Sequence, residues 1–422
     1  MRISSRCLLT LATFALPFSL PGQNADPRPP ATILVLKPAQ LFDGEALHVG
    51  WAVRVTADRI EAVGPASRID GNGGKAVDLP GLTLMPGLVE GHSHVFLHSY
   101  GETSWNDQVA HEGLALRVAR AVNHLRDELQ AGFTTIRDLG TEGAGYSDVE
   151  LKQAIEQGII PGPRMLVSTR AIVATNTYAP KGFVLEWHIP QGAEEADGVD
   201  SLIKVVRDQI GRGADWIKLY GDYRWGPHPG LHPTFSPEEM KLAVETAKSA
   251  GVPVAVHTST PEGMRRAILA GAETIEHGNE GTPEIFNLMV EHHVALCPTL
   301  TAGGGGVGNT DQQPSSAAAR HRSAFKSALD AGVTILSGSD VGTFPHGLNS
   351  WELDAMVEAG MSKINALKAA TSVAGQVLHM DIGQVKPKMF ADLIAVEGNP
   401  VEDLSALRRV KFVMKGGVVY KQ

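Results

Sequence analysis

The sequence predicts an α/β fold, namely a (β/α)8 TIM-type barrel with a small β-sandwich domain built from both chain ends. In the middle of the chain, eight short apolar segments alternate with helical text, which is typical of parallel strands in a barrel. At both ends, short alternating runs are separated by turn residues, which is typical of antiparallel strands. No G-x-G-x-x-G motif opens a helix after the first predicted barrel strand, so an open dinucleotide-binding sheet is disfavoured.

The first residues are typical of a secretory signal. MRISSR supplies two arginines, CLLTLATFALPFSL is an apolar run, and the polar stretch PGQNADPRPP follows. We predict a signal peptide over residues 1–24, cleaved between about Leu20 and Ala25. A membrane anchor is the alternative, but the apolar run is short for a span of roughly 20 residues. The protein is therefore expected to be secreted or periplasmic, with no membrane attachment after signal removal.

The rest of the chain divides into three predicted segments. Residues 25–85, with runs such as ATILVLKPAQLFDG and WAVRVTADRIEAVG, form the first part of the β-sandwich. Residues 86–380 form the barrel. Residues 381–422, with ADLIAVEGNP and KFVMKGGVVYK, form the second part of the sandwich.

Charge and cysteine content exclude two classes of protein. The 422 residues carry 37 basic and 46 acidic side chains without long runs of either sign, which argues against a nucleic-acid partner. Of the two cysteines, Cys7 leaves with the signal, so Cys297 remains alone and no disulfide framework is possible. Stability must then come from core size, bound metal or association, and we expect a homo-oligomer.

The eight apolar segments of the middle region are LVEGHSHV, FTTIRDLG, RMLVSTRAI, DWIKLYG, PVAVHTS, TIEHG, VALCPTL and TILSGSD. One helix between them has Ser236 as its candidate N-cap, Pro237 at the first helical position and Gly251 at its exit. In such barrels the chemistry lies at the C-terminal ends of the strands. The polar residues found at those ends are the candidate metal ligands: His92, His94, Lys218, His257, His277 and Asp340.

Two features of this set point to a metal site. His92 and His94 lie on the same face of a strand, because side chains alternate with period two, and two imidazoles there make half a zinc site. Lys218 lies inside an apolar strand, where a lone ammonium is costly unless something pairs with it. Pairing with Asp215 or Asp222 is one explanation, and a role at the metal site is the other.

Several motifs together resemble the amidohydrolase superfamily, in particular its binuclear-metal branch, over essentially the whole mature chain. They are FDG, MPGLVEGHSH, IKLY, VHT, EHG and SGSD, with the tail ADLIAVEGNP…VMKGGVVYK. In that family, H-x-H, a carboxylated lysine, two histidines and an aspartate hold two divalent metal ions. The family's usual D-x-H-x-H reads E-G-H-S-H here, with Glu90 in place of the first aspartate.

The resemblance assigns the ligands to two ions. We expect His92, His94 and Asp340 to hold one ion and His257 and His277 to hold the other. Imidazole, carboxylate and carbamate ligands favour zinc.

Lys218 and Asp340 have further expected roles. A dry strand end lowers the pKa of a lysine, and the neutral amine adds carbon dioxide to form a carbamate whose two oxygens can bridge two cations. A hydroxide between the ions would attack an amide or ester carbon. Asp340, the expected catalytic residue, would then deliver the proton to the leaving nitrogen.

The loops after the strands choose the substrate in this architecture. Tyr220, Tyr223 and Arg224, close to the lysine, are expected to bind a free carboxylate of a small-molecule substrate, and His346 is a further candidate. The glycine-rich stretch 301–316 is either a mobile rim or lid of the site or an ordinary surface loop.

Within the superfamily, the chain resembles exported Xaa-Pro dipeptidase-like and ochratoxin A-hydrolysing enzymes, with the STRAIVAT…PKGF…QGAEEADG stretch most indicative. The resemblance implies removal of the C-terminal amino acid from N-acyl amino acids or dipeptides, including cleavage of ochratoxin A to ochratoxin alpha and phenylalanine. It also implies a large homo-oligomer, such as an octamer. The alternatives are an imidazolonepropionase-like cyclic amidohydrolase, a non-catalytic assembly module, and a deaminase, against which Lys218 argues.

Overall fold

The computed structural model describes residues 32–184, 186–302 and 315–422. The predicted signal peptide and most of the glycine-rich stretch 301–316 lie outside these ranges. No helix in the described ranges is both long and apolar enough to cross a bilayer.

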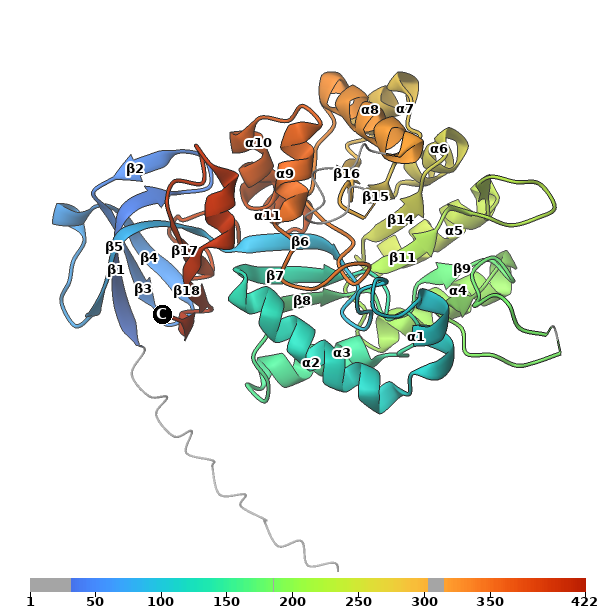
Figure 1. The fold of residues 1–422 in the computed structure, drawn as a ribbon, viewed down its shortest axis with the longest axis horizontal. Helices are drawn as coiled ribbons and strands as arrows, with labels where there is room; N and C mark the ends of the chain where they lie inside the picture. The colour runs from blue at the N-terminus through green and yellow to red at the C-terminus, as the bar shows by residue number, and fades with distance from the viewer. Residues whose placement is uncertain (1–31, 185, 303–314) are drawn as a thin grey trace, which may run out of the picture. The chain divides into compact units, whose positions relative to one another are not determined.

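The two ends of the described part of the chain, from Ile33 and up to Lys421, meet in one sheet (Figure 1). Its N-terminal strands are β1 (Ile33–Phe42), β2 (Leu47–Val49), β3 (Trp51–Thr56), β4 (Arg59–Pro65) and β5 (Lys75–Pro86). Its C-terminal strands are β17 (Leu393–Glu397), β18 (Val410–Lys415) and β19 (Val418–Lys421), and the order is β19-β18-β17-β5-β1-β3-β4 with β2 on β1. The antiparallel pair β5–β17 joins the two ends, with Met85 opposite Ile394.

This terminal sheet has its own apolar cluster, in which Leu36, Val53, Phe412 and Met414 are fully buried. The prediction that both chain ends build one small β unit is in accord with this pairing. Its division into two packed layers, and the boundaries at residues 25–85, 86–380 and 381–422, stay predictions.

The middle of the chain contains the parallel strands. They are β6 (Leu88–Ser93), β7 (Phe133–Asp138), β8 (Arg164–Val167), β11 (Ile217–Tyr220), β14 (Val254–Thr258), β15 (Thr274–His277) and β16 (Ala295–Cys297). Within this set, β6, β7 and β8 pair in parallel, as do β11, β14, β15 and β16. Most of their residues are buried, as expected for strands covered on both faces.

Backbone hydrogen bonds connect the two groups of strands. Asp215 N donates to Val167 O at 2.8 Å, which links β8 to the chain entering β11. On the other side, Leu296 N donates to Thr334 O, and Gly91 N donates to Ser337 O, both at 2.9 Å. The resulting α/β arrangement is TIM-barrel-like.

The eighth predicted strand, residues 334–340, occupies the place between β16 and β6 but is not a regular strand. Only isolated bridges are formed there, Leu296 with Ile335 and Ser93 with Val341. Between these two bridges, Asp340 has φ +61°, outside the extended region, so the segment does not form a continuous ladder. The position of this segment was predicted correctly, and its regular strand geometry was not.

Helices follow the parallel strands. They are α1 (Trp105–His111), α2 (Leu114–Gln130), α3 (Ser147–Glu156), α4 (Gly198–Gly211), α5 (Pro237–Lys248), α6 (Pro261–Ala270), α7 (Pro283–Glu291), α8 (Ser316–Ala331), α9 (Trp351–Glu358), α10 (Lys363–Ala369) and α11 (Ser372–Val377). Two short 3-10 turns cover Ala66–Arg68 and Leu404–Arg408. The two-residue strands β9 (Ile172–Val173) and β10 (Glu194–Glu195) extend the second parallel group in the order β10-β9-β11, and β12 (Asp222–Tyr223) and β13 (His232–Pro233) pair antiparallel with each other. The predicted start of α5 is confirmed, because Ser236 and Glu239 form a capping box with Pro237 as the first residue.

Candidate metal centre

The end of β6 supplies the first pair of imidazoles. His92 and His94 lie on one face, while Ser93 between them donates a hydrogen bond to Glu128 Oε1 behind the strand. The Nε2 atoms of His92 and His94 lie 3.5 and 3.3 Å from Oδ1 of Asp340. The ligand atoms of these three residues all lie within 4.8 Å of one another, which is close enough to share one cation.

Asp340 is placed by the backbone of the eighth segment. Its N–H donates to His92 O at 2.9 Å, and its carbonyl oxygen accepts from the Thr343 hydroxyl at 2.8 Å. Burial would raise the pKa of Asp340, but His92 and His94 hold it far below its usual range. The aspartate is therefore an anion aimed at two imidazoles.

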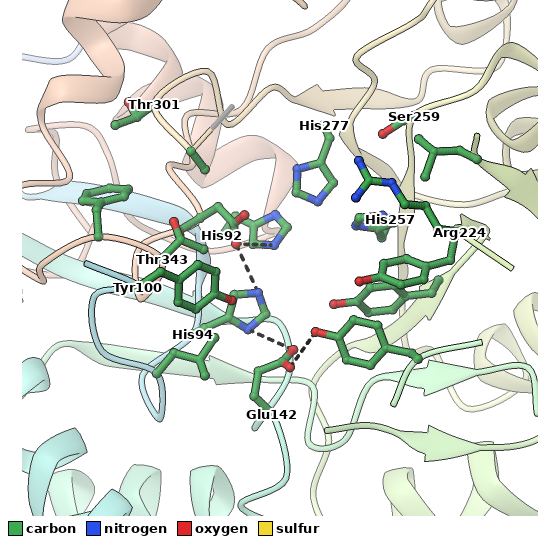
Figure 2. Close-up of a pocket in the computed structure, with 18 residues that line it drawn as sticks. His92, His94, Tyr100, Glu142, Arg224, His257, Ser259, His277, Thr301 and Thr343 are labelled. Atoms are coloured by element: carbon green, nitrogen blue, oxygen red, sulfur yellow. Dashed lines mark hydrogen bonds and ion pairs between the residues drawn. The ribbon is translucent and has the colours of Figure 1, made fainter. Parts of the chain in front are cut away.

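The second pair of imidazoles comes from neighbouring strands. The rings of His257, in β14, and His277, at the end of β15, lie 4.5 Å apart, and the His277 ring lies 5.0 Å from that of His92. His257 stacks on Tyr220, which fixes its plane. Figure 2 shows His92, His94, His257 and His277 around one space.

Lys218 reaches the same cluster from β11. Its side chain is fully buried, and Nζ lies 3.4 Å from His92 Nε2. The alternative partners are occupied elsewhere: Asp215 binds Lys152 at 2.7 and 2.8 Å, and Asp222 accepts bonds from residues 258–260. Burial lowers the pKa of Lys218, which favours the neutral amine that carboxylation requires.

The hydrogen bonds behind the histidines test whether this donor set fits a metal. His92 Nδ1 donates to Glu276 Oε2 at 2.8 Å, His94 Nδ1 donates to Gly140 O at 2.9 Å, and His277 Nδ1 lies 2.7 Å from Thr299 Oγ1. In His92 and His94 these bonds fix the tautomer that leaves Nε2 as the lone-pair nitrogen facing the cluster, as in metal-bound histidines. The residues present therefore fit divalent cations.

Protonation of the imidazoles follows their surroundings. Burial lowers the pKa of His92 to about 4 and the pKa of His257 to about 3, so both are neutral ligands near neutral pH. Burial alone would also lower the pKa of His94, but Asp340 and Glu142 raise it to about 9. The negative charges of Asp340 and Glu142 beside His94 would likewise favour a bound cation.

Sequence reasoning missed the buried ion pair that supports His92. Glu276 accepts from His92 with one oxygen and from Arg137 Nη2, at 2.9 Å, with the other. Both side chains are fully buried, and the Arg137 guanidinium also packs over the Trp216 ring. Charged residues inside the apolar runs FTTIRD and TIEH were the available signal, because each is costly to bury unpaired, as Lys218 is.

Glu90 has a supporting role in this structure. One of its oxygens accepts from the backbone N–H groups of His92 and Ser339, and the other accepts from Ser339 Oγ and Asn349 Nδ2. It therefore ties β6 to the segment that carries Asp340. Burial raises the pKa of Glu90 to about 7.

A cavity of about 620 Å³ opens over the cluster, and it is lined by five of the six predicted ligands, namely His92, His94, His257, His277 and Asp340. The predicted substrate-binding residues Tyr220, Tyr223 and Arg224 also line it. Sequence reasoning did not single out the other lining residues that carry chemistry, namely Tyr100, Glu142, Tyr178, Ser259, Thr301 and Thr343.

His346 is not among the residues that line this cavity. Its ring is buried, with Nδ1 2.5 Å from Glu128 Oε1 and Nε2 donating to Leu97 O at 2.9 Å, and it stacks on His124. Both ring nitrogens are thus engaged by the protein. The structure brings the other nine predicted site residues to the cavity or, for Lys218, to the buried cluster beneath it.

The family model described as "Amidohydrolase family" matches residues 83–420. The chain belongs to the amidohydrolase family. It is accordingly a hydrolytic enzyme, and the cluster described above is its candidate metal centre.

Similar amidohydrolases are known from sequence and from structure. Ochratoxinase from Aspergillus niger is 32% identical over 375 residues, which cover 80% of this chain and 75% of ochratoxinase. The solved structure of a Xaa-Pro dipeptidase with bound methionine in the active site has a TM-score of 0.82 at 28% identity, covering 93% of this chain and 100% of that one. The solved structure of A. niger ochratoxinase has a TM-score of 0.79 at 28% identity, covering 93% and 96%.

Proposed function

We propose that this amidohydrolase is a binuclear metal enzyme that releases the C-terminal amino acid from dipeptides or N-acyl amino acids, ochratoxin A among them. The observation that carries the proposal is one cavity lined by both the histidine–aspartate cluster and Arg224. The relatives named ochratoxinase and Xaa-Pro dipeptidase support the same class of amide substrate.

The proposal assigns the ligands to two cations, and zinc is the first ion to test. His92, His94 and Asp340 would hold one, His257 and His277 would hold the other, and Lys218, as its carbamate, would supply oxygen ligands to them. When bound, the cations supply a water of lowered pKa and polarise the scissile carbonyl.

The chain's own side chains then perform the remaining steps. Asp340 takes a proton from the attacking water at its carboxylate and passes it to the leaving nitrogen, so that the amine departs neutral. Its side chain is 16% exposed, which gives the carboxylate access to the cavity from a mostly buried position.

Arg224 and Tyr223 are assigned to the substrate carboxylate. Figure 2 shows the Arg224 guanidinium directed toward His257 and His277 from the rim. A guanidinium binds a carboxylate with two parallel charge-assisted hydrogen bonds, which gives orientation as well as affinity. The methionine in the active site of the similar dipeptidase is a free amino acid, a ligand with such a carboxylate.

A substrate panel on zinc-loaded enzyme tests this function. Release of phenylalanine or proline is expected from N-acyl-phenylalanine, Xaa-Pro dipeptides and ochratoxin A, and an Asp340→Asn variant that retains metal is expected to lose activity by about 100-fold or more. Ring opening of a cyclic amide, with no release of amino acid from any member of the panel, would contradict the proposal and favour an imidazolonepropionase-like enzyme.

A further inference from the structure

Glu142 is a carboxylate beside the metal-ligand cluster, and it has no role in the reaction proposed above. It follows β7 and lines the cavity, yet its side chain is only 2% exposed. Its backbone has φ +49°, in the left-handed region that is unfavourable for a residue with a Cβ atom. Backbone strain of this kind is concentrated at functional sites, where the surrounding structure maintains it.

The two oxygens of Glu142 have different surroundings. Oε2 accepts hydrogen bonds from the Tyr178 hydroxyl and from Trp105 Nε1, each at 2.8 Å, so the carboxylate is fixed in direction. Oε1 lies 3.7 Å from His94 Nδ1, but that nitrogen donates its proton to Gly140 O instead. Within the described part of the chain, Oε1 receives no hydrogen bond. Because Glu142 lines the cavity, Oε1 is free to accept a charge-assisted hydrogen bond from a cationic group that enters it.

We propose that Glu142 binds the α-ammonium group of the substrate, so that dipeptides with a free N-terminus are preferred over N-acyl amino acids. The inference rests on the proposed removal of a C-terminal amino acid. Glu142 Oε1 lies 3.7 Å from Nδ1 of the candidate ligand His94, so a cation bound to this oxygen would lie close to a substrate carbonyl at the metal centre. The α-ammonium of a dipeptide occupies that position.

The charge and the walls of the cavity agree with this assignment. Apart from the ligand Asp340, the lining contains one carboxylate, Glu142, and one guanidinium, Arg224, among the described residues, and Figure 2 shows them on different walls. A dipeptide zwitterion has one charge of each sign to match them. The rings of Tyr178 and Tyr220, 4.7 Å apart, add an aromatic surface next to Glu142, and such surfaces attract ammonium groups.

Two substrates that differ only in the ammonium group test the proposal. Alanyl-phenylalanine and N-propionyl-phenylalanine have the same amide and carboxylate, and both release phenylalanine. At pH 7 the zinc-loaded enzyme is expected to prefer alanyl-phenylalanine by about 10- to 100-fold in kcat/KM, the range for one hydrogen bond between charged groups.

The Glu142→Gln variant keeps an oxygen for Tyr178 and Trp105 but removes the charge. It is expected to lose most of that preference through a higher KM for alanyl-phenylalanine, with activity on N-propionyl-phenylalanine nearly unchanged. Tyr178→Phe, which loosens the carboxylate without neutralising it, is expected to lose part of the preference. Glu291→Gln, an exposed glutamate at the end of α7, serves as the matched control and is expected to behave as wild type.

The outcomes separate the inference from the function on which it rests. Equal wild-type activity on the two substrates, or a parallel loss on both in Glu142→Gln, overturns ammonium recognition and leaves the hydrolase. Failure of the wild-type enzyme to release phenylalanine from either substrate overturns the proposed function itself.

Discussion

At the scale of single residues, the chemistry of Lys218 depends most on its surroundings. It has no carboxylate partner in the described ranges, because Asp215 binds Lys152 and Asp222 binds the backbone and hydroxyls of residues 258–260. Its Nζ atom lies 3.4 Å from His92 Nε2. An ammonium at that distance from a metal ligand would repel a cation, whereas a carbamate would attract two.

Lys218→Ala is therefore expected to remove the bridge between the ions. The purified variant should contain less than one zinc ion per chain and lose at least about 100-fold in kcat, since a hydrolytic site of this kind needs both ions. Elemental analysis and the rate of phenylalanine release measure the two effects. Lys152→Ala, which breaks only the pair with Asp215, is the control and should keep the metal. Full zinc content in Lys218→Ala would remove the lysine from the centre.

Glu276→Gln tests the buried support of His92. The amide has no negative charge to hold the Nδ1 proton or to balance Arg137, so the metal-facing nitrogen of His92 becomes a poorer ligand. Zinc affinity, measured by competition with a chelator, is expected to fall by about 10- to 100-fold. Glu273→Gln, three residues earlier and paired only with the exposed His379, should leave affinity unchanged. Equal affinities in the two variants would count against the supporting role of Glu276.

At the scale of elements, the tight contact between β6 and the segment 334–340 positions three ligands at once. A Cβ atom on Gly338 would lie 2.4 Å from Cys297 Sγ and 2.7 Å from His92 N, so only glycine fits between β16 and β6. Two residues later, Asp340 donates its N–H to His92 O. Displacement of this segment would move Asp340 away from His92 and His94 together.

Gly338→Ala is expected to lower the free energy of unfolding by about 1–3 kcal/mol, the usual cost of overpacking, and to reduce zinc content in parallel. Thermal unfolding and elemental analysis report the two quantities. Gly211→Ala, at the end of α4 with nothing within 4 Å of the added atom, should be neutral or slightly stabilising. A Gly338→Ala protein as stable and as metal-rich as Gly211→Ala would show that the close contact does not matter.

The elements also show how far sequence reasoning can go. The strand ends and their ligands could be predicted, because a histidine, lysine or aspartate that follows an apolar run is conspicuous and the barrel gives those ends a common location. Glu276 and Arg137 could not be paired in advance, since they lie 139 residues apart and their contact depends on which strands are neighbours.

The outcome for His346 has a similar cause. It follows Asp340 by only six residues, yet its side chain turns to Glu128 and Leu97 and not into the cavity. Glu142 shows the opposite case, because a left-handed backbone and two bonds from Tyr178 and Trp105 direct an ordinary loop glutamate inward. Loop direction is set by such tertiary contacts, which spacing along the chain does not encode.

At the scale of the whole molecule, bound metal is expected to contribute to stability. Among the described residues no disulfide contributes to stability, since Cys297 is the only cysteine there and it is free and buried. Ligands that bind only the folded state stabilise it by mass action, by about 2.7 kcal/mol at 100 times Kd. Removal of zinc with a chelator should therefore lower the melting temperature by roughly 5 °C or more, and zinc should restore it. The Lys218→Ala variant should respond far less, and a wild-type melting curve indifferent to chelator would argue against occupied sites.

We also propose that the mature protein is an exported homo-oligomer, with an octamer as the first assembly to test. The exposed apolar side chains Leu114 and Leu116 on α2 and Leu269 on α6 support association through the helical layer. Light scattering coupled to size-exclusion chromatography gives the number of chains, and a monomer would contradict the proposed oligomer. Mass spectrometry of the protein exported by its cells gives the new N-terminus, and an intact Met1 would contradict the proposed removal of a signal peptide.

The anomalous signal of zinc in a crystal of the metal-loaded enzyme tests the metal centre most directly. Two peaks are predicted, one among His92, His94 and Asp340 and one beside His257 and His277, with density for an added carboxyl group on Lys218 between them. A single peak remote from these side chains, or none at full zinc loading, would contradict the account.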